Sequence, residues 1–407
     1  MLSKMPIEPI LSALLSRGGE YGELFYEEVR SLSVLLEDGK VERVLSGTDA
    51  GIGIRLIHRG KTFYAYTNEM EPRTLAALAS DLSRYAEGGG APVALPASPA
   101  AARSPSPVRV PPSARGIGEK TALVTLMDRV ARGASPEIRQ VRATYGEAER
   151  RIEVAAHPSG FASDAQTFSL LTVQCVAGDG GGLAAGYESG GGTAGWEFLE
   201  EFDPEALARK AALRAARSLS ARRIPGGRMP VVLSAEAGGT MVHEAIGHGL
   251  EADLARQGMS VYRDELGKEV ASPLVSIVDD ATVPWKRGSF GIDDEGTPGE
   301  RTVLVENGVL KGFLHDRLSA MKEGGRPTGN GRRESYRHKP IPRMSNTIEP
   351  VRGATITGDG PGLLKMIDRV GCDLGFGLGT CGKEGQGVPV GDAQPTLSIG
   401  PPWITVG

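Results

Sequence analysis

The residues whose types and spacing could carry chemistry lie together in one short segment, His243–His248, which reads HEAIGH. Its two imidazoles can supply neutral nitrogen ligands to a metal ion. The carboxylate of Glu244 can accept a proton from a metal-bound water. This set of groups is typical of a zinc hydrolase.

The spacing of the two histidines is unusual. In a common zinc peptidase helix they stand four residues apart, about 40° around the helix. Here they stand five apart, which is about 140° on an ideal α-helix and too far for one metal. A one-residue π-bulge would return His243 and His248 to one side, and Gly247 lowers the steric cost of such a distortion. A metal site here therefore requires a bulged helix.

A catalytic zinc site normally has three protein ligands and one open position. Three residues are candidates for the third ligand. Glu251 follows His248 by three residues and is the simplest candidate on local geometry, with Asp253 a weaker one. Cys381 is distant in sequence, but it stands in a glycine-rich loop and a thiolate is a good zinc ligand.

The elements that must position this motif divide into two predicted parts. Apolar and polar residues alternate over 21–67, with a hairpin turn at Asp38-Gly39. Helical periodicity predicts helices over 72–87 and 119–133, and Asp203-Pro204 begins a third that runs to about Arg222. Strand-like segments fill the interval up to about 200, and residues 88–115 form a loop rich in Pro, Ala and Ser. We predict an α+β domain with an antiparallel-rich sheet over residues 1–224.

Residues 225–407 are predicted to form a largely β domain that carries one active-site helix. Short strands are indicated at Leu274–Val278, Thr302–Val305 and Val309–Leu314, with a hairpin at Asn307-Gly308. The fold class is therefore α+β, and the metal-binding motif lies at the head of the second domain.

Composition excludes several functional classes. The 407 residues carry a net charge of −4 with interspersed signs, so we expect no nucleic-acid partner. No apolar run approaches the roughly 20 residues that cross a bilayer. The three cysteines are too few for a disulfide scaffold, and we expect a cytoplasmic protein. Of these, Cys175 and Cys372 are expected in the core.

The segment Val242–Asp253 resembles the zinc motif of the TldD/PmbA family, also called modulators of DNA gyrase. It matches the TldD side, because the PmbA (TldE) side lacks this motif. Further strings support the resemblance along most of the chain: Leu36–Gly39, Gly288–Gly296, Gly329–Thr347 and Cys381–Leu397. Members of that family carry a longer stretch between the positions of Thr347 and Val351, so either this chain is shortened there or the stretch is missing from the sequence.

The resemblance implies a zinc metallopeptidase of the TldD type that hydrolyses peptides or unfolded polypeptides. It implies His243, His248 and Cys381 as ligands of Zn²⁺ and Glu244 as general base. The active site would be enclosed between subunits, the partner being a PmbA/TldE-type subunit or a second copy of the chain. Glu251 and Asp253 then become residues that orient the imidazoles.

Other polar residues are weaker candidates. A transition-state donor is expected among Tyr262, Tyr336 and His338, and Arg332 is a candidate for substrate binding. The acidic run Asp293–Glu295 is expected to be a solvated loop more than a second cation site. Two alternative functions stay open: a catalytically silent partner or scaffold subunit, and a zinc hydrolase of small amides.

Overall fold

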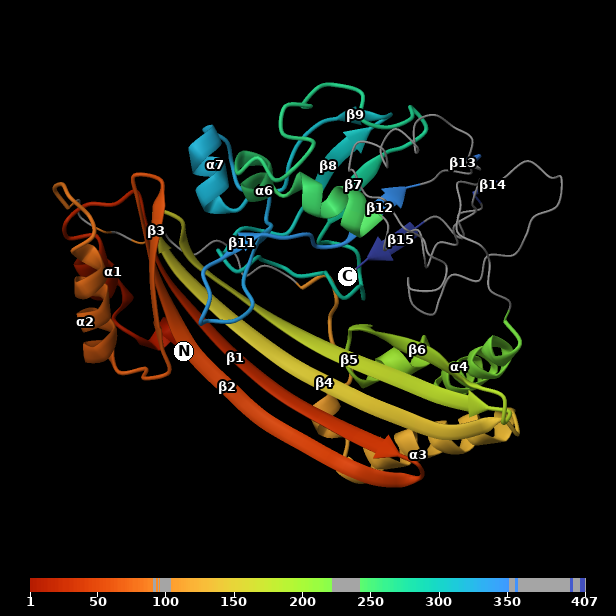
Figure 1. Ribbon diagram of the computed structural model, residues 1–407. Helices are drawn as coiled ribbons and strands as arrows, with labels where there is room; N and C mark the ends of the chain where they lie inside the picture. Colours follow the sequence, from red (N-terminus) through yellow and green to blue (C-terminus); the bar gives the residue numbers. More distant parts are fainter. Residues whose placement is uncertain are drawn as a thin grey trace.

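A long, curved, antiparallel sheet forms the base of the molecule (Figure 1). The computed structural model describes residues 1–90, 104–221 and 242–350, residues 93 and 95, and strand segments 356–357, 396–397 and 403–406. The sheet has the order β3-β2-β1-β4-β5-β6, and each neighbouring pair is antiparallel. Its strands are β1 (Tyr21–Glu37), β2 (Lys40–His58), β3 (Lys61–Thr67), β4 (Ile138–His157), β5 (Gly160–Gly178) and β6 (Leu183–Thr193).

The hairpin between β1 and β2 turns at the predicted residues. Asp38 and Gly39 have φ values of 48° and 75°. Two successive positive φ angles match the right-handed twist of the flanking strands, and aspartate and glycine tolerate them best. The predicted turn is confirmed.

Four helices of the described part of the chain lie against this sheet. Three are at the predicted places, namely α2 (Pro72–Ser83), α3 (Ile117–Ala134) and α4 (Pro204–Leu219). The side chain of Asp203 accepts a hydrogen bond from the backbone N–H of Glu205, as expected of a cap. Helix α1 (Ile7–Leu14) was not predicted, although it buries Ile10 and Leu14 against the sheet. Short 3₁₀ turns occur at Leu2–Lys4, Pro112–Ala114 and Trp196–Glu200.

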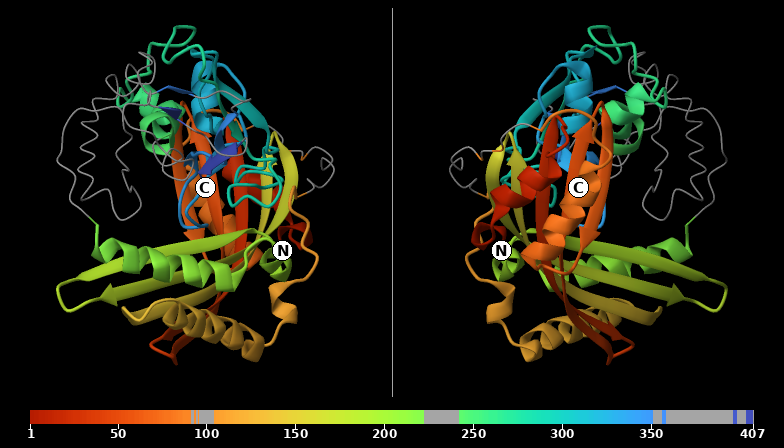
Figure 2. Two further views of the ribbon diagram at one scale, coloured as in Figure 1. Left: turned by 90° about the vertical axis from the view of Figure 1, so that its right-hand side faces the viewer. Right: turned by 90° about the vertical axis from the view of Figure 1, so that its left-hand side faces the viewer.

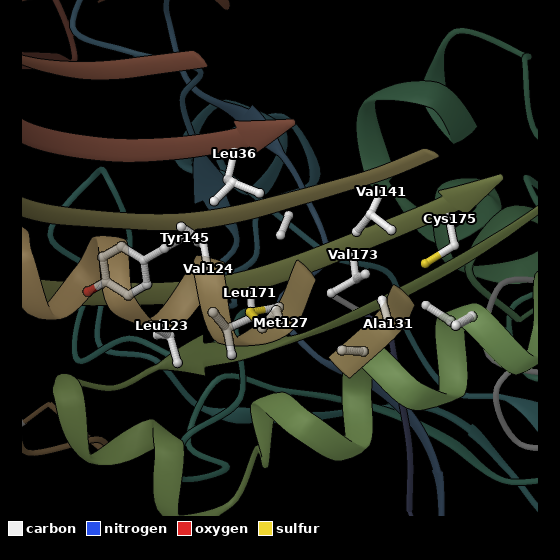
Figure 3. Packing of buried hydrophobic residues seen from close by; sticks show 14 of the residues in the cluster. Leu36, Leu123, Val124, Met127, Ala131, Val141, Tyr145, Leu171, Val173 and Cys175 are labelled. Carbon is white, nitrogen blue, oxygen red and sulfur yellow. The ribbon is translucent and has the colours of Figure 1, made fainter. Parts of the chain in front are cut away.

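Two separate cores hold the helices on the sheet. One joins α1 and α2 to β1, β2 and β3. The other lies between α3, α4 and the far half of the sheet, and Figure 3 shows Val124 and Met127 of α3 among side chains from β1, β4 and β5. Cys175 is fully buried in this second core, which confirms the expectation for that residue.

The C-terminal part lies at the opposite end of the molecule from α3 in both views of Figure 2. It has a five-stranded sheet of order β15-β12-β7-β8-β9, formed by Ile277–Asp280 (β7), Arg301–Glu306 (β8), Val309–Leu310 (β9), Thr347–Pro350 (β12) and Trp403–Val406 (β15). Two strand pairs accompany it: β10 (Gly331–Arg332) with β11 (Ile341–Pro342), and β13 (Ile356–Thr357) with β14 (Thr396–Leu397). The α+β class is confirmed. Helix α7 (Arg317–Glu323) lies in a region where almost all of the chain was expected to form short strands and turns.

The acidic run Asp293–Glu295 is buried, so the prediction of a solvated loop is wrong. All three side chains are at most 1% exposed. Arg150 of β4 pairs with Asp294 at 2.8 Å, and Arg55 of β2 pairs with Glu295. These arginines neutralise carboxylates that burial would otherwise destabilise strongly.

A third buried pair, Arg333 with Glu23 of β1, lies in the same layer. We call these three pairs the sheet–loop ion cluster. It joins the long sheet to the C-terminal part, together with apolar contacts of Ile292 and Tyr336 against β1 and β4. The predicted domain boundary at residues 224 and 225 lies outside the described residues.

Candidate metal centre

The histidine motif forms a π-helical turn over His243–Gly247, followed by a 3₁₀ turn over His248–Leu250. The wider turn places the two imidazoles with ring centroids 4.7 Å apart and ring planes at 85°. The predicted bulge is therefore confirmed. Its consequence is that residues five apart in sequence lie side by side.

His243, Glu244 and His248 form a cluster whose ligand atoms all lie within 4.8 Å of one another. The two imidazoles are half-buried, whereas Glu244 is exposed. Nδ1 of His243 is buried and has no hydrogen-bond partner. Burial, and secondly the neighbouring His248, lowers the pKa of His243 and favours the neutral imidazole. Neutral ring nitrogens with a nearby carboxylate are the donor set that zinc takes in hydrolases, so the residues fit this ion.

Glu251 lies directly behind His248. Its side chain is fully buried, with Oε1 3.2 Å from Nδ1 of His248 and Oε2 2.6 Å from Nη1 of Arg343. Burial raises the pKa of Glu251, although Arg343 and then His248 act in the opposite direction. Both carboxylate oxygens are engaged, and Nε2 of His248 remains for a metal. This geometry favours an orienting role for Glu251 over a ligand role.

Tyr262 contacts the same segment, whereas the side-chain hydrogen bond of Asp253 is to its neighbour in the chain. Oδ1 of Asp253 accepts from the backbone N–H of Leu254 at 2.9 Å, and burial raises the pKa of Asp253. The hydroxyl of Tyr262 donates to the carbonyl oxygen of Ala245 at 3.2 Å, inside the π-turn. Its buried ring lies against Gly249, where an added β-carbon would come within 2.8 Å of it. Tyr262 therefore stabilises the π-turn through its hydroxyl and the packing of its ring.

The other three candidates lie against the long sheet and the sheet–loop ion cluster. The guanidinium of Arg332 lies 4.7 Å from the ring centroid of Phe290. Tyr336 is buried, and its hydroxyl is 3.3 Å from Asp49. Nδ1 of His338 is 3.1 Å from the hydroxyl of Ser335. These contacts describe packing and local polar pairing, and none of them reaches the histidine pair.

Arg343 is a residue of this centre that sequence reasoning missed. In the sequence it is only one residue of the string Gly329–Thr347, and nothing local connects it to a glutamate 92 residues earlier. Its neighbour Met344 packs against Gly247 of the π-turn. The proposed third ligand, Cys381, lies outside the described residues, as does Cys372.

An α+β protein that presents two histidines and a glutamate on a π-turn is, by its site, a candidate metal-dependent hydrolase. Comparison with known families agrees. Residues 22–86, 110–219 and 226–350 match domain 1, the central domain and the C-terminal domain of the PmbA/TldA metallopeptidases. The chain belongs to this family.

Two relatives illustrate the similarity. The Haemophilus influenzae "Metalloprotease TldD homolog" is 31% identical over 470 aligned positions, covering 100% of this chain and 96% of the relative. Because this chain has 407 residues, at least 63 of those positions have no counterpart in it. A "Metalloprotease" of Methanothermobacter thermautotrophicus is 33% identical, covering 93% of this chain and 94% of the relative.

Solved structures share the fold. A Thermotoga maritima protein described as a candidate modulator of a DNA gyrase superposes with a TM-score of 0.67 at 22% identity, covering 78% of this chain and 72% of that one. TldE from Thermococcus kodakarensis superposes with a TM-score of 0.68 at 17% identity, covering 81% and 74%. Among the described residues, no helix combines the length and apolarity needed to cross a membrane.

Proposed function

We infer that this chain is a zinc-dependent peptidase that hydrolyses peptides or unfolded polypeptides. The observation that carries the proposal is the π-turn, because it converts a five-residue histidine spacing into a compact cluster with Glu244 beside it. The metalloprotease names of the relatives, one of them a zinc metalloprotease, support the same class.

His243 and His248 would hold the zinc ion, with Cys381 as the third ligand by family resemblance. When bound, zinc would supply a Lewis acid that lowers the pKa of a water at this site. Glu251 would hold the ring of His248 in place through Nδ1. The described part of the chain would thus contribute two ligands and the residues that support them.

Glu244 would be the general base. It follows the first ligand directly and is exposed, so its carboxylate can reach a water between the imidazoles and a substrate. It would take the proton of the attacking water and later deliver it to the leaving amine. Proton transfer by a positioned carboxylate contributes about 10²- to 10⁴-fold to the rate.

The partner is proposed from the family. A PmbA/TldE-type subunit, or a second copy of the chain, would enclose the site and exclude folded proteins. Substrate choice would then be steric, and the protein is proposed to act in the cytoplasm.

The test is Glu244→Gln, measured by zinc content and by cleavage of an unfolded casein chain. We expect near-stoichiometric zinc and loss of cleavage by at least about 10²-fold. Glu306→Gln, at an exposed position of β8, is the matched control and should cleave normally. Cleavage by Glu244→Gln at the wild-type rate would reject the assigned base.

The same preparations separate the alternatives. A wild-type protein without zinc and without cleavage would support the silent scaffold. Zinc-dependent turnover of small amides in the absence of casein cleavage would support the amide hydrolase.

A further inference from the structure

A continuous series of polar contacts runs behind the histidine pair and joins two distant parts of the chain. Nδ1 of His248 lies 3.2 Å from Oε1 of Glu251, and Oε2 of Glu251 lies 2.6 Å from Nη1 of Arg343. Glu251 ends the 3₁₀ turn of the motif, whereas Arg343 directly follows β11. The carboxylate therefore bridges an imidazole and a guanidinium.

The backbone of Arg343 is fixed on both sides. Its N–H donates to the carbonyl oxygen of Asn330 at 2.9 Å, and its carbonyl oxygen accepts from Nδ2 of Asn330 at 3.0 Å. Nδ2 of Asn330 also donates to the buried Asp279 at 2.7 Å. The side chain is 43% exposed, yet it starts from a backbone that cannot shift without breaking these bonds.

Burial makes the pairing of Glu251 with Arg343 necessary. The glutamate side chain is fully buried, and the only cation in salt-bridge contact with it among the described residues, apart from a protonated His248, is Arg343. A buried carboxylate that loses its cationic partner is strongly destabilised, which favours conformations in which it moves toward solvent or another partner. A displaced Glu251 would no longer hold Nδ1 of His248.

We propose that Arg343 is a positioning residue of the metal centre, which holds the carboxylate of Glu251 so that His248 presents Nε2 to the ion. In this arrangement Nδ1–H of His248 donates a hydrogen bond to Oε1 of Glu251. A ligand imidazole whose other nitrogen donates to a carboxylate is fixed in tautomer and orientation. This inference rests on the proposed function, since it concerns the same zinc ion.

The decisive measurement is zinc affinity, because a residue that only stabilises the fold would leave the affinity of folded protein unchanged. Arg343→Met should weaken Zn²⁺ binding about 10- to 100-fold in competition with a chromophoric chelator. Arg343→Lys should recover most of that loss, because an ammonium can donate to the same carboxylate. Arg326→Met, which removes an arginine that is 75% exposed and paired with Glu300, should bind zinc normally.

A second readout tests the route through Glu251. Glu251→Gln should weaken zinc binding to a similar degree. If both residues act through the same contact, the double variant Glu251→Gln/Arg343→Met should have the same zinc affinity as the single variant that binds zinc less tightly. The absorption spectrum of the cobalt-substituted protein should change in both single variants, because the geometry around the ion changes.

Zinc affinity of Arg343→Met within threefold of wild type overturns the proposal. If Arg343→Met does not fold, unchanged zinc affinity of Glu251→Gln overturns it instead. A wild-type protein that binds no zinc rejects the proposed function and this inference together. Normal zinc binding and cleavage by wild type and Arg343→Met alike reject only the role of Arg343.

Discussion

Met344 occupies the space that a side chain on residue 247 would need. A β-carbon added to Gly247 would lie 2.0 Å from the sulfur of Met344, well inside any van der Waals contact. The backbone of Gly247 itself is helical, with φ of −52° and ψ of −57°. Close packing of Met344, more than backbone conformation, therefore opposes a side chain at this position, and the thioether must shift to admit one.

We predict that Gly247→Ala disturbs the π-turn and costs roughly 1–3 kcal/mol, the usual range for overpacking a core. The same substitution should lower the zinc affinity, because the π-turn sets the separation of His243 and His248. Unfolding in urea and chelator competition measure the two effects.

The double variant Gly247→Ala/Met344→Ala is the internal check, since removing the thioether vacates the space. It should regain part of the zinc affinity. Gly133→Ala in α3 is the control, because a β-carbon there meets nothing within 4 Å. A normal zinc affinity for Gly247→Ala would show that the turn tolerates a side chain.

Much of the architecture could be predicted from local sequence signals. Alternation and turn residues predicted the β1–β2 hairpin, and Asp203 was recognised as a helix cap. The bulge followed from arithmetic on the spacing of His243 and His248. These features depend on residues within a few positions of one another, so a sequence window contains their causes.

The rest depends on residues far apart in the chain. The charges of Asp294 and Glu295 suggested a solvated loop, because their partners Arg150 and Arg55 come 144 and 240 residues earlier. Arg343 and Glu251 are likewise brought together only by the fold. A charged residue is predicted to lie on the surface unless an oppositely charged residue is known to be buried beside it.

We predict that Arg55→Met is strongly destabilising. Its side chain and that of Glu295 are both fully buried, so the variant leaves an uncompensated carboxylate between the long sheet and the C-terminal part. Breaking one side of such a pair costs about 3–5 kcal/mol. Urea denaturation should show this loss in the free energy of unfolding.

Adding Glu295→Gln to Arg55→Met should recover part of the stability, because the unpaired charge is removed. Arg326→Met breaks an exposed pair with Glu300 and should cost about 0–1 kcal/mol. If Arg55→Met cost no more than Arg326→Met, the sheet–loop ion cluster would not contribute to stability.

The pH dependence of stability should show a contribution from Asp316. Burial, followed by repulsion from Glu295, raises the pKa of Asp316 to about 6 from 3.8. The folded protein therefore holds this proton more tightly than the unfolded chain does. The resulting stabilisation is complete below pH 4 and is lost as the pH rises to about 6.

We predict that the free energy of unfolding of wild type, relative to Asp316→Asn, falls by about 2 kcal/mol between pH 4.5 and 7. Asparagine suits the comparison because it can also cap α7, where Asp316 accepts from the N–H of Ser319 at 2.7 Å. Urea unfolding of both proteins at several pH values gives the difference. A constant difference across this range would contradict the raised pKa.

Substitution of two cysteines tests the identity of the third zinc ligand. We predict that Cys381→Ser lowers the zinc affinity because a direct ligand is removed. The loss should exceed the 10- to 100-fold that is typical when a residue supporting a ligand is replaced. Cys175→Ala is the control: burial raises the pKa of Cys175 to about 12, so its thiol stays neutral in the core between α3 and the sheet. It should lower stability and leave zinc content unchanged. Zinc retained by Cys381→Ser but lost completely by Glu251→Gln would instead make Glu251 the third ligand.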